Sequence, residues 1–142
     1  MTTSKGRLLG VDFGTVRVGL AVSDADRIIA SPLETLKRRD ANADAEHFNR
    51  LIRAEQIVGL VVGLPLHTGG EEGIKAREAR AFGQWLGEAT GLPVDFWDER
   101  CTTAAAEDSL REAGLSHRKR KDRRDRVAAQ IILQSYLDSR SS

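Results

Sequence analysis

The chain has 142 residues with a hydrophobic fraction of 40%, a charged fraction of 30% and a net charge of +1, which together indicate one soluble globular domain spanning residues 1–142. No apolar run approaches the roughly 20 residues that a membrane span needs, and the N-terminus lacks the apolar region of a signal peptide. The single cysteine, Cys101, cannot form an internal disulfide, which fits a protein of the reducing cytoplasm. One Cys and three His also make a structural zinc site unlikely. We therefore expect a cytoplasmic protein with no membrane partner.

Residues 7–24, RLLGVDFGTVRVGLAVSD, predict two strands joined by a tight turn. Side chains alternate along a strand, so Leu8, Gly10 and Asp12 share one face of the first strand. The second strand alternates in the same way. A carboxylate such as that of Asp12, set in an apolar strand, loses hydration unless a hydrogen-bond donor, a Lys or Arg, or a metal ion compensates it.

A third strand is predicted over Ile28–Leu36, and Pro32 places it at a sheet edge or at a bulge. The spacing of apolar residues then changes to a helical period over Ala41–Glu55. The continuous apolar run at 57–65 is typical of a buried parallel strand, so the intervening helix is expected to be a crossover connection.

A loop is predicted at His67–Gly73, followed by a helix over Ile74–Ala89 with Gly91 as its C-terminal cap. A short strand is predicted at Val94–Trp97, directly before the sequence Asp-Glu-Arg.

Two more helices are expected to complete the chain. The first begins near Thr102 or Thr103 and ends at Gly114, and a basic loop follows it. The last begins near Asp125. Its predicted core face consists of Val127, Ala128, Ile131 and Ile132. The order of elements predicts an α/β fold, a mixed five-stranded sheet with helices packed on its faces.

The basic run HRKRKDRRDR at 117–126 contains seven Lys or Arg and two Asp. Such a run is often a solvated segment, and it can also contact a phosphate backbone. The sequence favours neither interpretation over the other. The run has no aromatic residue, which favours contact with phosphates over stacking on bases.

Three acidic residues fall at the ends or starts of apolar elements: Asp12 in the first strand, Glu99 after the last strand and Asp125 at the start of the last helix. Sites in open α/β sheets gather at the carboxyl ends of strands. Asp125 has Ala129 and Ile132 at helical spacing, which turns it toward the core. Each residue also has an ordinary explanation: a turn-forming aspartate, a partner for a neighbouring Arg, and a helix N-cap.

Taken together, the three carboxylates indicate metal chemistry. They would repel one another in one place unless a divalent cation bound them, and Mg²⁺ and Mn²⁺ prefer oxygen ligands. Two such ions roughly 3.5–4 Å apart can activate a water and stabilise the leaving oxygen of a phosphodiester. We therefore expect Asp12, Glu99 and Asp125 to be both metal ligands and catalytic residues.

Four blocks of the chain, in order and suitably spaced, resemble the YqgF family, the Holliday-junction-resolvase-like or pre-16S rRNA nucleases of the RNase H-like superfamily. The blocks are GVDFGTVRVGLAVSD at 10–24, VVGLPLHTGGEE at 61–72, DERCTT at 98–103 and DRVAAQIIL at 125–133. The resemblance covers nearly the whole chain, and four blocks in order are far more specific than any one of them.

The resemblance implies an RNase H-like fold and maps the acidic triad of the family onto Asp12, Glu99 and Asp125. Two positions that are usually basic in the family correspond to Arg17 and Arg80. With the neighbouring basic residues, the expected contacts to nucleic acid are Arg17, Arg80, Arg100, Lys119, Arg120 and Arg123.

The chain departs from the family pattern in three places. Val16 stands where the family often has Lys, His67-Thr68 replaces an Asn-Met-like pair, and Cys101 replaces an aliphatic residue. These changes spare the expected ligands and leave open which substrate contacts the loop at 67–73 makes.

The expected function is hydrolysis of structured nucleic acid by a metal-dependent phosphodiesterase that is a monomer or a weak homodimer. The resemblance implies 5′-end processing of the small-subunit rRNA precursor. Cleavage of branched DNA is the alternative, and a non-catalytic assembly factor that binds nucleic acid is a further one. The DFGT turn also resembles the first phosphate loop of actin-like and sugar-kinase ATPases, but those proteins need two such domains.

Overall fold

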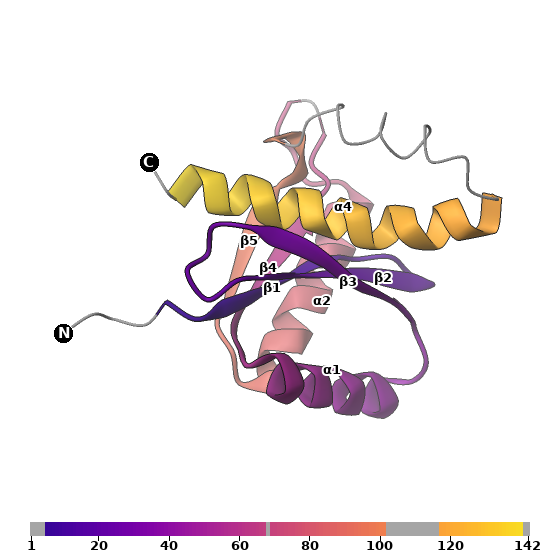
Figure 1. The fold of residues 1–142 in the computed structure, drawn as a ribbon. Coiled ribbons are helices and arrows are strands. Elements are labelled where there is room, and N and C mark those ends of the chain that lie inside the picture. The colour runs from indigo at the N-terminus through magenta and orange to yellow at the C-terminus, as the bar shows by residue number, and fades with distance from the viewer. Residues whose placement is uncertain (1–4, 68, 102–116, 141–142) are drawn as a thin grey trace.

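The structure is a computed structural model that describes residues 5–67, 69–101 and 117–140. A five-stranded sheet lies at its centre, in the order β3-β2-β1-β4-β5 (Figure 1). The strands are β1 (Arg7–Asp12), β2 (Arg17–Ser23), β3 (Ala30–Lys37), β4 (Ile57–Leu64) and β5 (Val94–Asp98). The helices are α1 (Ala41–Glu55), α2 (Ile74–Thr90), the short 3₁₀ helix η1 (Glu99–Cys101) and α4 (His117–Arg140).

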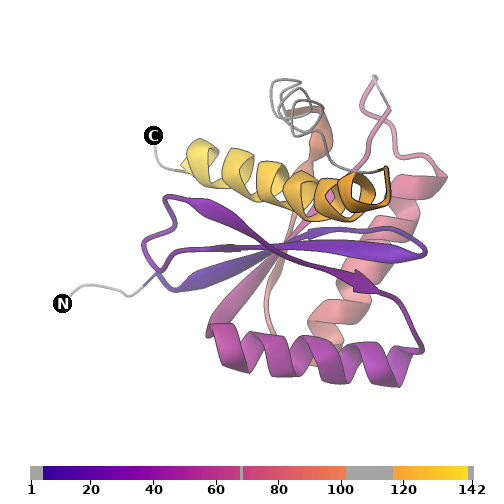
Figure 2. The ribbon, with the colours of Figure 1, turned by 45° about the vertical axis from the view of Figure 1, so that its right-hand side comes forward.

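The sheet is mixed and separates two helical layers. Strand β1 pairs antiparallel with β2 and parallel with β4, β2 pairs antiparallel with β3, and β4 pairs parallel with β5. Helix α4 covers one face of the sheet, and α1 and α2 cover the other (Figures 1 and 2). This arrangement confirms the predicted RNase H-like class of fold. None of the helices in the described ranges is both long and apolar enough to cross a membrane.

Most elements lie where the apolar pattern predicts them. Helix α1 has the predicted bounds, and the side chain of Asp40 caps it by accepting a hydrogen bond from the amide of Ala43 at 2.8 Å. Pro32 lies on the edge strand β3, where the pairing with β2 shifts register. Pro32 therefore occupies both an edge strand and a bulge, the two positions in a sheet where proline is tolerated.

The prediction that a basic loop precedes the last helix is wrong from His117 onward, because α4 begins at that residue rather than near Asp125. Lys and Arg have high helix propensity, and no Gly or Pro interrupts the sequence from 117 to 140. The basic residues therefore extend the helix that the apolar residues anchor. The expected helix from Thr102 or Thr103 to Gly114 lies outside the described residues.

Two hydrophobic cores lie on the two faces of the sheet. Leu9 of β1 packs with Phe48 of α1 and Leu86 of α2, while Leu8 packs with Leu133 of α4 on the opposite face. This confirms the alternation predicted along β1. The buried face of α4 differs from the prediction and consists of Ala129, Ile132, Leu133, Tyr136 and Leu137. The apolar residues of α4 are close enough in sequence to form either of two adjacent faces of the helix. The packing of α4 on β1 and β2 decides which face is buried.

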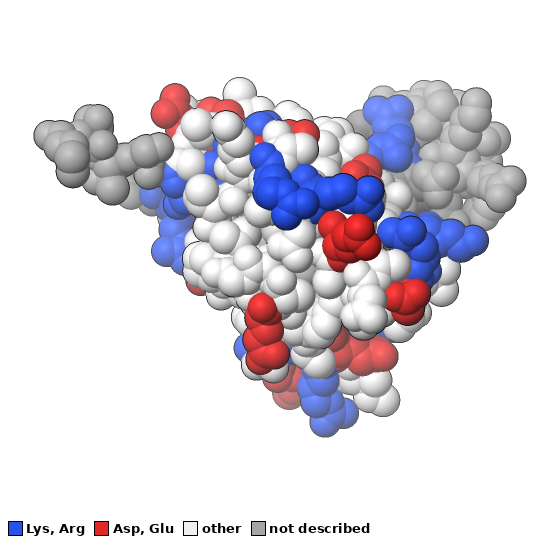
Figure 3. Space-filling model, turned by 90° about the horizontal axis from the view of Figure 1, so that it is seen from below, with Lys and Arg blue, Asp and Glu red and all other residues white. Residues whose placement is uncertain are grey.

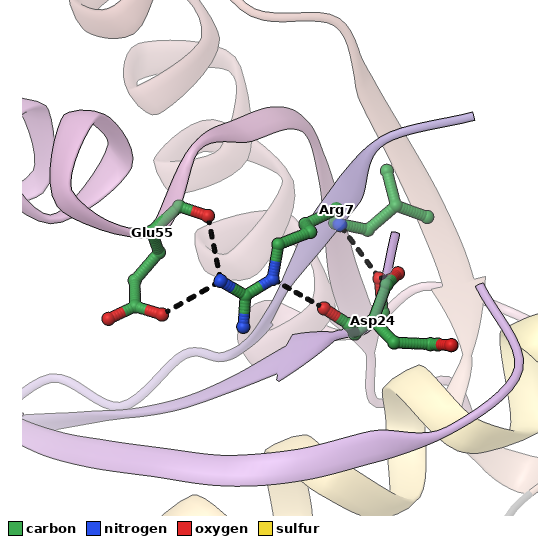
Figure 4. A network of polar contacts seen from close by, with 5 residues as sticks. Arg7, Asp24 and Glu55 are labelled. Carbon is green, nitrogen blue, oxygen red and sulfur yellow. Dashed lines mark hydrogen bonds and ion pairs between the residues drawn. The ribbon is translucent and has the colours of Figure 1, made fainter. Parts of the chain in front are cut away.

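A polar network ties the start of β1 to its neighbours (Figure 4). Arg7 Nε donates to the carbonyl of Ser23 at 3.0 Å, and Arg7 Nη1 lies 3.1 Å from the carbonyl and 3.2 Å from the carboxylate of Glu55. The Ser23 hydroxyl in turn accepts from the amide of Leu8 at 2.9 Å. One guanidinium thus joins the first strand, the end of β2 and the last turn of α1.

Helix α4 approaches β2 closely at Gly19. A Cβ atom on Gly19 would lie 1.8 Å from the backbone oxygen of Asp125, a distance that no real contact allows. Gly19 is also the pairing partner of Asp12 across the β1–β2 ladder. The missing side chain therefore lets the helix backbone rest on the sheet directly beside Asp12.

We expect the substitution Gly19→Ala to lower the free energy of unfolding by at least about 2 kcal/mol, because the methyl group meets backbone rather than a movable side chain. The measurement is urea unfolding followed by circular dichroism. Gly59→Ala in β4 is the matched control, since the closest atom to its Cβ would be the flexible end of Leu8, at 2.9 Å, with Pro93 at an ordinary contact distance of 3.9 Å. Equal losses for the two variants would contradict the close contact between α4 and β2.

Candidate active site

The carboxyl ends of β1 and β5 bring two acidic residues to the same edge of the sheet. Asp12 is the last residue of β1, and Glu99 directly follows β5 as the first residue of η1. Both strands run parallel to β4, which lies between them, so all three strands end on the same side. This is the edge at which open α/β sheets carry their sites.

Gly63 of β4 makes room for Glu99 between these strands. A Cβ on Gly63 would lie 2.9 Å from Glu99 Oε2 and 2.7 Å from Ile132 Cδ1, so a side chain there would displace the carboxylate or the helix. Because Gly63 has none, the carboxylate of Glu99 lies over β4, toward Asp12.

Asp12 and Glu99 line one pocket of about 300 Å³. The residues that line it are Asp12, Phe13, Gly14, Thr15, Pro65, Lys75, Glu78 and Glu99. They come from the end of β1, the β1–β2 turn, the segment after β4, the first turns of α2 and the start of η1. The pocket is therefore acidic and holds one cationic side chain, Lys75.

The surroundings of Asp12 favour its protonated form. Burial, then the charge of Glu99 and then that of Asp125, raise the pKa of Asp12 from 3.8 to about 7. Burial also raises the pKa of Glu99, with a further contribution from the charge of Asp98. A bound divalent cation would reverse both effects, because it favours the ionised carboxylates.

Asp125 lies close enough to act on Asp12 through its charge, but its carboxylate is held by another residue. Arg17 Nε donates to Asp125 Oδ2 at 2.8 Å, and each of these two side chains is 25% exposed. The pocket that Asp12 and Glu99 share is not lined by Asp125. The structure thus brings two carboxylates of the predicted triad into one pocket and leaves the third beside it, paired with Arg17.

The donor set fits a hard divalent cation in part. Asp12 and Glu99 supply carboxylate oxygens, which Mg²⁺ and Mn²⁺ prefer. Within the described part of the chain, however, no three His, Cys, Asp or Glu side chains are arranged to hold a metal ion. Two carboxylates could hold the cation, and Asp125 could join them only by leaving Arg17.

Sequence analysis overlooked two residues of the pocket, Lys75 and Glu78. Both lie at the start of α2, three residues apart and therefore on one face of the helix. The signal was available, because α2 follows β4 and must begin at the edge where β4 ends.

Besides Arg17, which pairs with Asp125, two of the arginines predicted to contact nucleic acid have partners within the protein. Arg80 pairs with Glu72 at 2.6 Å, and its guanidinium lies 4.8 Å from the centre of the Phe96 ring. Arg100 pairs with Asp98 at 2.6 Å. Neither contact tests binding to nucleic acid, so both assignments remain predictions.

The other predicted contacts belong to the first turns of α4. Arg123 is exposed there, whereas the side chains of Lys119 and Arg120 lie outside the described residues. Figure 3 views the molecule from the side of α1, opposite α4, and shows basic and acidic side chains interspersed with each other and with uncharged surface. The described residues on that face thus form no continuous basic track for a phosphate backbone.

Comparisons with known proteins agree with this geometry. The sequence model of the RuvX family, described as Holliday junction resolvase, matches residues 6–139. A protein of Rhodopirellula baltica is 47% identical over 134 residues, which cover 94% of this chain and 78% of the relative. A protein of Rhodobacter capsulatus is 45% identical over 133 residues, covering 94% and 84%. Both carry the name "Putative pre-16S rRNA nuclease".

Solved structures share the fold at low sequence identity. RuvC of T. thermophilus in complex with a Holliday junction substrate superposes with a TM-score of 0.55 at 15% identity, covering 94% of this chain and 95% of the other. The fowlpox virus resolvase with its substrate Holliday junction DNA gives a TM-score of 0.56 at 11% identity, covering 96% and 99%. At these identities the similarity concerns the fold alone.

The raised pKa of Asp12 predicts a pH-dependent stability in metal-free buffer. Between pH 4 and about 7 the folded protein retains a proton that the unfolded chain has released, so stability falls as the pH rises through this window. Asp12→Asn cannot ionise. We expect it to melt at a higher temperature than the wild type at pH 7.5 in EDTA, with the difference shrinking toward pH 4. Thermal melts across this range are the measurement, and a difference independent of pH would contradict the prediction.

Proposed function

The chain belongs to the RuvX family, and on this basis we propose that it is a metal-dependent nuclease that hydrolyses phosphodiester bonds of structured nucleic acid. The observation that carries the proposal is the pocket at the carboxyl end of the sheet that the partly buried Asp12 and Glu99 both line. Buried like charges are costly, and they persist where a ligand compensates them. A divalent cation and a phosphate together form such a ligand.

In this proposal, Asp12 and Glu99 bind a Mg²⁺ or Mn²⁺ ion, and Asp125 is the third ligand. When bound, the ion supplies Lewis-acid chemistry for phosphodiester hydrolysis. Arg17 holds Asp125 in place by its hydrogen bond, so that the third carboxylate stays beside the pocket with its charge paired. Ion binding would compete with Arg17 for this carboxylate.

Lys75 is the cation that this pocket presents to a substrate. Its ammonium group can neutralise a phosphate oxygen while Asp12 and Glu99 hold the ion. Glu78, one turn further along α2, lines the same pocket and limits how much negative charge can enter. Lys75 is therefore proposed to bind the substrate phosphate, and Glu78 to limit the negative charge that the pocket accepts.

The substrate we propose is the precursor of 16S rRNA, processed at its 5′ end in the cytoplasm. The names of relatives at 45–47% identity support this choice, because those relatives match nearly the whole chain. Branched DNA is the second candidate, favoured by the description of the RuvX family. An assembly factor that binds nucleic acid without cutting it would keep the basic residues and show no metal-dependent cleavage.

We expect the wild type to cleave labelled rRNA precursor or a four-way DNA junction with Mg²⁺ or Mn²⁺ and to be inactive in EDTA. Asp12→Asn and Glu99→Gln should each lose at least about a hundredfold in cleavage rate, because each removes a charged ligand. Gel analysis of end-labelled products gives both the rate and the preferred substrate. Cleavage by Asp12→Asn at the wild-type rate would overturn the metal site.

We further expect that neutralising Lys119, Arg120 and Arg123 weakens binding to RNA and DNA alike, because these residues directly precede Asp125 along α4. Each lost phosphate contact reduces the slope of log affinity against log salt by roughly 0.7–0.9, so the triple variant should show a slope flatter by about two units. Salt titrations on a duplex and on a single strand measure it. An unchanged slope would mean that these residues make no phosphate contact.

A further inference from the structure

A second pocket adjoins the acidic one. Its volume is about 380 Å³, and the two pockets are neighbours that share Phe13 and Glu78 in their linings. The second pocket is lined by Phe13, Arg38, Ala41, Glu78, Ala81, Phe82 and Trp85. The function proposed above uses the first pocket and assigns nothing to the second.

Aromatic side chains concentrate in this second pocket. The chain has only four Phe, two Trp and one Tyr, and three of these residues line it. The ring centre of Phe82 lies 4.8 Å from that of Phe13 and 5.5 Å from that of Trp85. Phe82 is buried and forms the floor, whereas Phe13 and Trp85 are only partly buried and present ring surface. The three rings thus make a hydrophobic platform beside the acidic pocket.

Arg38 completes the platform with a planar cation. Its guanidinium carbon lies 5.2 Å from the ring centres of both Phe13 and Phe82, which is a cation–π distance. The amide of Arg38 donates to the carbonyl of Val16 at 2.9 Å and so fixes this residue beside the β1–β2 turn. The side chain is 31% exposed, and one guanidinium face can therefore meet a ligand.

The Nε atom of Arg38 is buried and has no hydrogen-bond partner among the residues that the structure describes. The nearest carboxylate oxygen, on Asp44, is 3.9 Å away, which is too long for a hydrogen bond. An unsatisfied buried donor is rare and costly. The guanidinium thus contacts the rings of Phe13 and Phe82 without a hydrogen bond from Nε to the described residues.

The charges of this pocket select the kind of ligand. Arg38 is its one cationic lining residue, and Glu78 opposes it. A second phosphate would be repelled by Glu78, which also faces the acidic pocket. A flat, neutral and polarisable group suits aromatic rings and a guanidinium plane. A nucleobase has these properties, and every base presents such a face.

We propose that this pocket, formed by Phe13, Arg38, Phe82 and Trp85, binds an unpaired nucleobase of the strand whose phosphate occupies the neighbouring acidic pocket. The inference rests on the proposed nuclease function and adds a requirement to it. A base inside a duplex is stacked between its neighbours and cannot enter a pocket lined by side chains. The substrate must therefore have a single-stranded nucleotide next to the bond that is cut.

The test uses the full-length chain with Asp12→Asn and Mg²⁺, which is expected not to cut its substrate. The probes are a single-stranded RNA that contains 2-aminopurine and the same strand in a perfect duplex. We expect tighter binding of the single strand and a decrease in 2-aminopurine fluorescence on binding, since stacking on an aromatic ring quenches it.

Added to that protein, Trp85→Leu and Arg38→Lys should weaken binding of the single strand roughly 5- to 30-fold and leave duplex binding unchanged. Trp85→Phe keeps an aromatic ring and should bind within about threefold of its parent. Ile29→Ala is the matched control, because Ile29 is 61% exposed and lies outside the pocket. It should bind both probes as the parent does.

Two results would overturn the base pocket: unchanged fluorescence of the bound probe, or equal single-strand affinities for the parent, Arg38→Lys and Trp85→Leu. Arg38→Lys affects a partly exposed side chain, so it tests the pocket even if Trp85→Leu fails to fold. The cleavage assay on the wild type is independent of these measurements. Cleavage without stacking rejects the base pocket alone, and stacking without cleavage supports the pocket while rejecting the nuclease.

Discussion

The close contact between the backbone of α4 and the sheet is the constraint on which the site depends. Gly19 allows the helix to rest on β2, and Gly19 is paired with Asp12 across the ladder. Gly10 of β1 has the same role further along α4, where a Cβ would meet Leu133 at 2.7 Å. Two small residues thus determine how near the start of α4, with Asp125, comes to the end of β1.

The proximity of Asp125 and Glu99 to Asp12 destabilises the protein when no cation is bound, because like charges repel one another. Three carboxylates lie near one another, and the structure reduces their repulsion in two ways. Asp12 tends to keep its proton, because burial and its neighbours raise its pKa to about 7. Asp125 is paired with Arg17. A fold optimised for stability alone would have an apolar residue in place of Asp12, and this cost supports the ligand site proposed above.

The two adjoining pockets divide the recognition of a nucleotide between charge and stacking. One gathers carboxylates and Lys75, which suit a cation and a phosphate, and the other gathers aromatic rings and Arg38, which suit a base. Phe13 links the two, because it directly follows Asp12 and lines both pockets. A strand that places its phosphate at Asp12 would therefore bring a flanking base to the aromatic side.

Most of the elements and the acidic positions follow from the sequence alone. The alternation in β1, the apolar run of β4 and the helical period of α1 are local properties, because burial of one face imposes the same spacing on every residue of an element. Three further facts came only from the folded chain: which stripe of α4 is buried, that Arg17 pairs with Asp125, and that Lys75, Glu78 and Arg38 line pockets beside Asp12. These facts join residues distant in the chain, and they depend on how the helices dock on the sheet, which no local pattern specifies.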